Sequence, residues 1–288
     1  ALSTKGNGVD VLVMTATPIP RTLTLTAYGD MDVSRMPDKP PGRQPVDTRV
    51  ISMDRYAEVA QGLSNALQDG ARVYWVCPLV SESELIDLAA AEDRANALRT
   101  IYGDKVGLVH GQMKAVEKDT VMARFVSGEI SILVATTVIE VGVNVPEATV
   151  MVIEHAERFG LAQLHQLRGR VGRGLDKSSC VLLYRGPLGE TAKARLGIMR
   201  ETEDGFKIAE EDLRLRGAGE VLGTRQSGLP TFRLANLEAH ANLLPAVHDD
   251  VKMVLERDPS LESSRGAALR LLLYLFRRDE AIRFLQSG

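Results

Sequence analysis

Cysteine, long apolar runs and excess positive charge are all scarce in this sequence. The two cysteines, Cys77 and Cys180, stand far apart without cysteine or histidine neighbours, so neither a disulfide framework nor a zinc site is expected. Both lie in apolar runs, which predicts buried free thiols in a reducing compartment. No stretch reads as a signal peptide or membrane span, so we expect a cytoplasmic protein without a membrane partner. The net charge of −3 confines any nucleic-acid site to a local patch.

Apolar runs rich in β-branched residues alternate with helical patterns through the middle of the chain. Strands are predicted at residues 48–53, 72–77, 106–110, 130–135, 149–154 and 179–185. Helices are predicted at residues 55–68, 85–102, 115–126 and 160–171. Strands that are apolar on both sides and alternate with helices indicate an α/β fold, with a doubly wound parallel sheet covered on both faces. Such sheets bind ligands beyond the carboxyl ends of their strands.

The two ends of the chain depart from this alternation. Residues 1–36 predict a strand at 9–15, a helix at 20–28 and a possible strand at 31–36, before a proline-rich linker at 37–42. Their sheet has no other members here, so we expect this stretch to be disordered, folded back or paired with another copy. The start at Ala1, just before a strand, suggests a piece of a longer chain. Beyond residue 189 we expect helices at 189–203, 207–216, 237–257 and 266–285. The glycine-rich stretch at 217–234 predicts a helical turn followed by an irregular loop.

The octet at residues 166–173 carries the strongest chemical signal. If the predicted helix continues through it, Gln166, Arg170 and Arg173 share one face at spacings of four and three. Gly169 and Gly172 leave bare backbone beside the arginines. Guanidinium groups bind phosphate oxygens bidentately and keep their proton, so the pattern predicts a polyphosphate site. The alternative is a solvated basic helix, which explains the arginines but not the glycines.

Two further segments combine hydroxyl side chains with a strand end. Thr136 and Thr137 open the segment at 136–146, where hydroxyls and backbone amides could hold phosphates of a nucleic acid or a nucleotide. The alternative is an ordinary connection with a helix cap. The segment at 15–18 has the same placement and, taken alone, is only a capping motif.

Taken together, the motifs resemble the second half of a superfamily 2 helicase. They are Thr15-Ala16-Thr17-Pro18, Pro40-Pro41-Gly42-Arg43, Val109-His110-Gly111-Gln112, the segment at 136–146 and the octet with its flanks. The match continues through residues 212–220 and 222–228, which resemble the translocation motif of the RecG helicases. That family remodels stalled forks and branched DNA junctions. A similar motif occurs in transcription-repair coupling factors, which are the nearest alternative family.

The resemblance implies a role for each matching residue. Gln166, Arg170 and Arg173 would meet the γ-phosphate of ATP. Nucleotide contacts are also implied for Gly142, Asn144 and Gly169, although the family usually has Asp where this chain has Asn144. DNA contact or coupling is implied for Thr15, Thr17, His110, Thr136, Thr137, Arg214, Arg216, Arg225 and Gln226.

One part of such an enzyme is missing from the sequence. It contains neither a Gly-x-x-x-x-Gly-Lys-Ser/Thr loop nor an Asp-Glu-x-His box, which helicases use to hold ATP and Mg²⁺. We therefore expect no complete cofactor site and no metal site here, and no ATPase activity from this chain alone. The first motor domain and an upstream wedge domain would be partners, together with branched or duplex DNA. A non-catalytic module that binds DNA or a partner is the third interpretation.

The expected domain organisation has four parts. Residues 1–45 would be the tail of a first RecA-like motor domain and a linker, and residues 46–188 the second RecA-like domain. Residues 189–235 would form a helical hairpin with the translocation loop, followed by a helical extension at 236–288.

Overall fold

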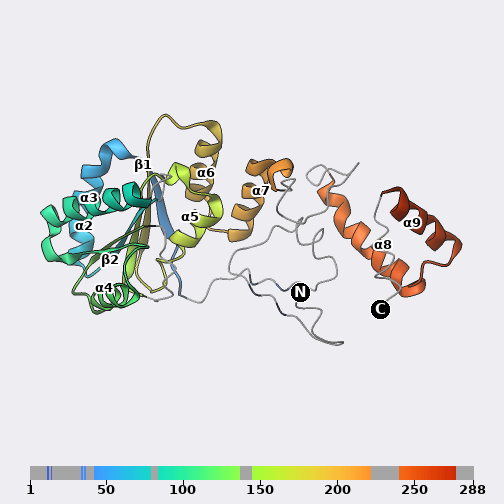
Figure 1. Cartoon of the computed structure of the whole chain (residues 1–288), viewed down its shortest axis with the longest axis horizontal. Coiled ribbons are helices and arrows are strands. Elements are labelled where there is room, and N and C mark those ends of the chain that lie inside the picture. The colour runs from blue at the N-terminus through green and yellow to red at the C-terminus, as the bar shows by residue number, and fades with distance from the viewer. Residues whose placement is uncertain are drawn as a thin grey trace. The chain divides into compact units, whose positions relative to one another are not determined.

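A computed structural model describes residues 42–78, 84–136, 145–221 and 240–276, together with four isolated positions near the N-terminus. The chain divides into two compact units (Figure 1), and each is described by itself. The first contains residues 42–215, and the second contains the chain from Arg216 onward.

The first unit is built on one six-stranded parallel sheet. Its strands are β1 (Val46–Ser52), β2 (Arg72–Cys77), β3 (Val106–Val109), β4 (Ile132–Thr136), β5 (Ala148–Ile153) and β6 (Ser178–Tyr184). Their order across the sheet is β1-β6-β5-β2-β4-β3, and every neighbouring pair is parallel. All six predicted strands are confirmed, with ends within two residues of those expected.

Helices cover both faces of this sheet (Figure 1). One face packs against α2 (Tyr56–Gln68) and α3 (Glu84–Tyr102). The other packs against α4 (Ala115–Ser127), α5 (Leu161–Arg168), α6 (Glu190–Glu201) and the first part of α7 (Gly205–Val221). Short 3₁₀ turns are η1 (Met53–Arg55), η2 (Gly103–Lys105) and η3 (Ala156–Arg158). The expected doubly wound RecA-like architecture is therefore confirmed.

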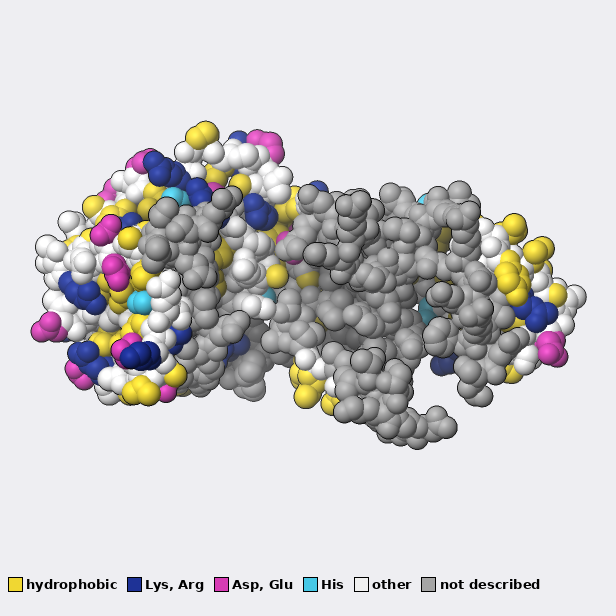
Figure 2. All heavy atoms as spheres, in the orientation of Figure 1, with side chains coloured by type: hydrophobic (Ala, Val, Ile, Leu, Met, Phe, Trp, Pro, Cys, Tyr) yellow, Lys and Arg dark blue, Asp and Glu magenta, His cyan; other side chains and the backbone are white. Residues whose placement is uncertain are grey.

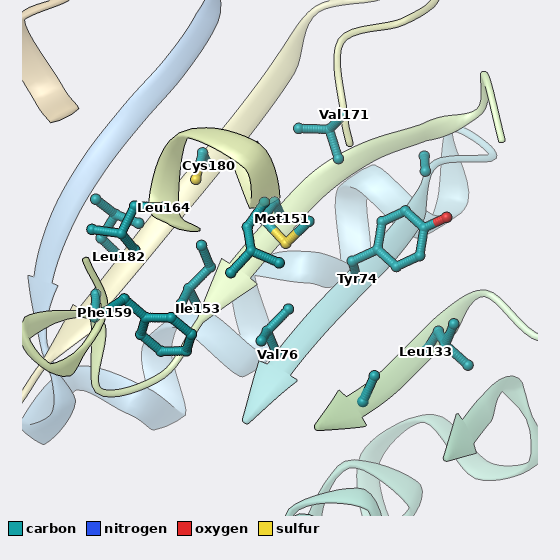
Figure 3. Close-up of a cluster of buried hydrophobic side chains, with 14 of the residues drawn as sticks. Tyr74, Val76, Leu133, Met151, Ile153, Phe159, Leu164, Val171, Cys180 and Leu182 are labelled. Atoms are coloured by element: carbon teal, nitrogen blue, oxygen red, sulfur yellow. The ribbon is translucent and has the colours of Figure 1, made fainter. Parts of the chain in front are cut away.

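The two cores follow from the alternation of side chains along each strand. On β2, Tyr74 and Val76 enter the cluster shown in Figure 3, while Val73 and Trp75 enter the cluster on the opposite face. Trp75 is fully buried. Burying one such side chain contributes about 1.5–3 kcal/mol, so a strand apolar on both sides is stable only between two layers of helices.

Both cysteines are buried free thiols, as predicted. Burial raises the pKa of each thiol, to about 12 for Cys180, because a thiolate would lose its hydration in the apolar interior. Surface charges are mixed. On the face of the first unit seen in Figure 2, basic and acidic side chains are interspersed, in keeping with the small net charge.

The N-terminal strands predicted from the sequence are wrong at the positions that the structure describes. Leu12, Met14, Ser34 and Met36 lie outside any helix or strand, and Leu12 is 81% exposed. Apolar alternation alone does not make a strand, because a strand needs a neighbour to satisfy its backbone groups. The helix predicted at 20–28 and the linker at 37–41 lie outside the described residues.

Each of the four helices predicted beyond the sheet has a counterpart among the described residues, with different ends. Helix α7 continues through Gly217 and Gly219 to Val221, where a helical turn before an irregular loop was expected. The second unit contains η4 (Ala241–Leu243), α8 (Leu244–Arg257) and α9 (Ser264–Leu275). Ser263 caps α9 by accepting a hydrogen bond from the Gly266 amide at 3.0 Å. Within the described ranges, no helix is long and apolar enough to span a bilayer.

Candidate functional site

The predicted arginine-bearing helix ends earlier than the sequence suggested. Helix α5 ends at Arg168, and the amides of Arg170 and Val171 then form turn hydrogen bonds to Leu167 and Arg168. Gly172 adopts a left-handed φ of +70°. Arg170 and Arg173 therefore stand on a turn, and the helical face that they were expected to share with Gln166 does not exist. Two glycines within four residues favour a turn over continued helix.

This turn, residues 169–174, is packed against the amino ends of the strands. A Cβ on Gly172 would come within 2.8 Å of Val46, the first residue of β1. A Cβ on Gly174 would come within 3.1 Å of the carbonyl oxygen of Pro146, just before β5. Val171 belongs to the same buried cluster as Tyr74, which lies near the start of β2 (Figure 3). We call these six residues the arginine turn.

Positive charges converge on the arginine turn. Burial, then the charges of Arg170 and Arg43, lower the pKa of Arg173, although that guanidinium remains charged at any physiological pH. Burial raises the pKa of Tyr74, and the nearby charges of Arg170 and Arg173 oppose that rise. Like charges held together repel each other unless an anion joins them. The arrangement therefore suits a polyphosphate.

The candidate residues of the octet differ in how far they are exposed to solvent. Arg173 is exposed, and its Nε donates to the carbonyl oxygen of Gly169 at 3.2 Å. Arg170 and Gly169 are half-buried, while Gln166 is exposed on α5 one turn earlier. The four residues predicted from the octet thus lie in one short stretch, with two guanidinium groups near the surface.

Arg168, a third arginine of the octet, faces the interior. It is 3% exposed, and its NH1 donates to the carbonyl oxygen of Met199 at 2.6 Å and to the Thr48 hydroxyl at 3.4 Å. Arg168 thus ties α5 to α6 and β1. The sequence did not single it out, because nothing in the spacing distinguishes a buried arginine from an exposed one.

His110 and Thr136 lie at the opposite edge of the sheet, beyond the carboxyl ends of β3 and β4. Val109 is in register with Ala135, so the residue that follows each of them reaches the same edge. Thr136 is 2% exposed. Among the described residues, neither its Oγ1 nor the buried Nδ1 of His110 finds a hydrogen-bond partner. A buried polar atom left without a partner is costly, so this edge is suited to receive a ligand.

A buried carboxylate network braces the same edge. Glu154 follows β5 and is 5% exposed. One of its oxygens accepts a hydrogen bond from the Trp75 indole at 2.5 Å, and the other from Arg94 at 3.1 Å. Arg94 lies over the ring of Tyr56, 3.8 Å from its centroid. No local pattern predicts this network, because its members come from α2, β2, α3 and the residue after β5.

The remaining predicted residues are only partly described. Arg214 is exposed on α7 and forms an ion pair of 2.8 Å with Glu211, one helical turn earlier. Arg216 lies on the same helix, where only the backbone is described. The other predicted residues lie outside the described residues: Thr15, Thr17, Thr137, Gly142, Asn144, Arg225 and Gln226. Among described residues, no cluster of histidine, cysteine and carboxylate side chains could hold a metal ion.

Two family descriptions match the chain. Residues 56–174 match the helicase conserved C-terminal domain. Residues 202–280 match the C-terminal part of domain 3 of the ATP-dependent DNA helicase RecG. The first match runs from α2 through the arginine turn and includes β2, β3, β4 and β5, and the second covers α7, α8 and α9.

Whole sequences and a solved structure agree with these matches. The ATP-dependent DNA helicase RecG of Acidithiobacillus ferridurans is 54% identical over 256 residues, which is 88% of this chain and 37% of that protein. RecG of Escherichia coli strain K12 is 52% identical over 250 residues, 86% of this chain and 36% of the relative. A structure of RecG bound to a three-way DNA junction superposes with a TM-score of 0.65 at 46% identity, covering 82% of this chain and 30% of that one.

The chain thus spans little more than a third of the length of these relatives. The sheet, the arginine turn and the domain 3 segment are the parts that correspond. On this evidence, the chain belongs to the RecG family of ATP-dependent DNA helicases.

Proposed function

We propose that this chain supplies the second motor domain and the translocation segment of an ATP-dependent DNA helicase that remodels branched DNA and stalled forks in recombination and repair. The convergence of the half-buried Arg170 and the exposed Arg173 on one short turn is the observation that carries the proposal. A first motor domain would hold ATP and Mg²⁺ through its own P-loop and acidic box. The second domain would bring the arginines to the γ-phosphate and stabilise the charge that develops during transfer.

The amino ends and the carboxyl ends of the strands would bind different ligands. The arginine turn, at the amino edge, would face the nucleotide and the first motor domain. His110 and Thr136, at the carboxyl edge, would face the phosphate backbone of DNA, where the buried Thr136 hydroxyl would gain a hydrogen bond that no described residue supplies. Separate edges allow closure around ATP to move DNA without the two ligands competing for the same side chains.

The family and the RecG-type domain 3 favour branched DNA as the substrate. Arg214 and Arg216 on α7 would support the translocation loop that contains Arg225 and Gln226. The four-part domain organisation and the wedge domain remain part of this proposal. Action on DNA would place the protein in the cytoplasm, as expected from its sequence. The nucleotide contacts of Gly142 and Asn144, and the coupling by Thr15 and Thr17, also remain proposals.

The proposal is tested in the full-length helicase that carries this chain, by DNA-stimulated ATP hydrolysis and fork reversal. Arg170→Ala and Arg173→Ala should each lower kcat by roughly 10²- to 10³-fold, the size of loss seen when one transition-state donor is removed. Arg49→Ala is the matched control, because Arg49 is an exposed arginine on β1 that pairs only locally with Asp47 at 2.7 Å. Wild-type hydrolysis in both arginine-turn variants would refute the proposed role.

A second experiment separates the helicase from a binding module. The chain taken alone should hydrolyse no ATP, with or without DNA, because its sequence holds no P-loop and no acidic box. Full-length protein prepared in parallel should hydrolyse ATP when a model fork is added. A full-length protein that binds the fork without any hydrolysis would favour the non-catalytic interpretation.

A further inference from the structure

Arg43 lies directly before β1 and makes a long-range contact with the arginine turn. Its Nε donates a hydrogen bond of 2.8 Å to the carbonyl oxygen of Gly172, 129 residues further along the chain. The bond is partly buried. Arg43 belongs to the Pro-Pro-Gly-Arg segment noted in the sequence, for which no role was assigned.

The neighbouring residue contacts the same turn. Gly42 has a left-handed φ of +83°, and a Cβ placed there would meet the Cδ2 atom of Leu175 at 3.0 Å. Two consecutive residues, Gly42 and Arg43, therefore approach the chain at 172–175. This second approach shows that the contact of Arg43 belongs to a packed segment and not to a single extended side chain.

The hydrogen bond from Arg43 to Gly172 is placed where it can orient Arg173. The carbonyl carbon of Gly172 is joined covalently to the nitrogen of Arg173, so holding that carbonyl fixes the peptide plane from which Arg173 departs. Gly172 itself is a residue with wide conformational freedom. A hydrogen bond at this carbonyl is thus well placed to select one orientation of the turn.

The charge of Arg43 adds to the same site. Burial is the largest cause of the lowered pKa of Arg173, and the nearby charges of Arg170 and Arg43 lower it further. A protein gains nothing in stability from bringing like charges together. The repulsion would be relieved when a polyphosphate joins the guanidinium groups.

We propose that Arg43 is a positioning residue of the ATP site: its bond to the Gly172 carbonyl holds the arginine turn in its productive orientation, and its cationic head adds a third positive charge for the phosphates. This inference rests on the proposed function of Arg170 and Arg173. The hydrogen bond from Arg43 to Gly172 would support the chemical step, and the positive charge of Arg43 would raise the affinity for the nucleotide.

Three substitutions in the full-length helicase separate these two contributions. Arg43→Gln places an amide nitrogen where the arginine has its Nε, and so keeps the donor without the charge. Arg43→Lys keeps the charge but has a methylene group at that position. Arg43→Met removes both and keeps the length of the side chain. The measurements are kcat and KM for ATP in DNA-stimulated hydrolysis, with thermal unfolding to confirm that each variant is folded.

The expected result is a split between the two kinetic parameters. Arg43→Gln should keep kcat within about twofold of wild type while KM rises about tenfold, because only the charge is lost. Arg43→Lys should keep KM and lose about tenfold in kcat, because a displaced catalytic group reacts slowly. Arg43→Met should show both losses. Equal kcat values for Arg43→Gln and Arg43→Met would overturn the positioning role, and equal KM values for Arg43→Lys and Arg43→Gln would overturn the charge role.

The outcome for Arg43 can be told apart from the outcome for the proposed function. If Arg170→Ala and Arg173→Ala abolish hydrolysis while all three Arg43 variants match wild type, only the inference about Arg43 fails. If the Arg170 and Arg173 variants remain active, the ATP site itself is misassigned, and the proposed role of Arg43 is refuted as well.

Discussion

Gly172 and Val46 approach each other so closely that no side chain fits between them. A Cβ on Gly172 would lie 2.8 Å from the Cγ2 of Val46, and Gly172 also holds a left-handed φ of +70°. The start of β1 therefore packs directly against the arginine turn at Gly172. Only glycine fits there, because the position has no room for a Cβ and its backbone adopts a left-handed φ.

This contact predicts the effect of Gly172→Ala. The change should lower the free energy of unfolding by about 1–3 kcal/mol, because alanine is strained at this φ and also collides with Val46. Chemical denaturation of the chain measures the loss. In the background of Val46→Ala, the same change should cost less, since the collision is removed and only the backbone strain remains. An undiminished cost in that background would show that Val46 is not the limiting contact.

Arg168 and Arg173 should differ sharply in what they contribute to stability. Arg168→Met should lower the free energy of unfolding by about 1–3 kcal/mol, because the Met199 carbonyl oxygen loses its buried donor. Arg173→Ala should change it by less than about 0.5 kcal/mol, as expected for an exposed side chain. Denaturant titrations of the two variants make the comparison. A larger loss for Arg173→Ala than for Arg168→Met would contradict the structural assignment of the buried arginine.

Thr136 offers a test of the carboxyl edge. Thr136→Val should leave the free energy of unfolding unchanged or raise it, because no residue in the described ranges forms a hydrogen bond with the hydroxyl that is removed. If this hydroxyl meets DNA, the full-length variant should bind a fork about fivefold more weakly, the value of roughly 1 kcal/mol for one hydrogen bond. Fluorescence anisotropy with a labelled fork measures the affinity.

Thr48→Val is the matched control for that experiment. The Thr48 hydroxyl donates to the Val46 carbonyl oxygen at 3.2 Å and accepts from Arg168 at 3.4 Å, far from the carboxyl edge. Its loss should lower the free energy of unfolding by about 1 kcal/mol and leave fork affinity intact. If Thr48→Val weakens fork binding as much as Thr136→Val does, the effect is not specific to the edge.

Cys180 predicts a loss of stability at alkaline pH. Burial raises its pKa from 9.0 to about 12, so the folded state retains a proton that the unfolded chain releases. This contribution to the free energy of unfolding is complete below pH 9 and falls as the pH rises from there towards 12. Denaturation at pH 7 and pH 10.5 should show a steeper loss for wild type than for Cys180→Ala. Equal slopes would mean that the thiol does not titrate as burial requires.

The sequence was informative where one physical effect dominated. Strands buried on both faces are continuous apolar runs, so β2 was located to the residue. The end of α5 was missed because periodicity carries no information on where backbone hydrogen bonding stops. Gly169 and Gly172 supplied the missing signal, since closely spaced glycines favour a turn. Helix α7 shows that glycines do not always end a helix, because it continues through Gly217 and Gly219, where a helical turn was expected.

The assembly of the site depended on contacts between distant parts of the chain. Arg43 and Gly172, or Trp75 and Glu154, are brought together only by the sheet order, in which strands distant in sequence become neighbours. No local pattern records such pairs. The sequence therefore predicted that guanidinium groups would bind phosphate. It did not predict at which end of the strands they lie or which residues hold them in place.

The central claim is that Arg170 and Arg173 act on the transferring phosphate and not on DNA. The most direct measurement is the affinity of the full-length helicase, bound to a fork, for ADP with aluminium fluoride, which mimics the phosphoryl group in flight. The account predicts tight trapping by wild type, and a loss of about 10²-fold or more in Arg173→Ala with fork affinity unchanged. Undiminished trapping together with weakened fork binding would contradict it.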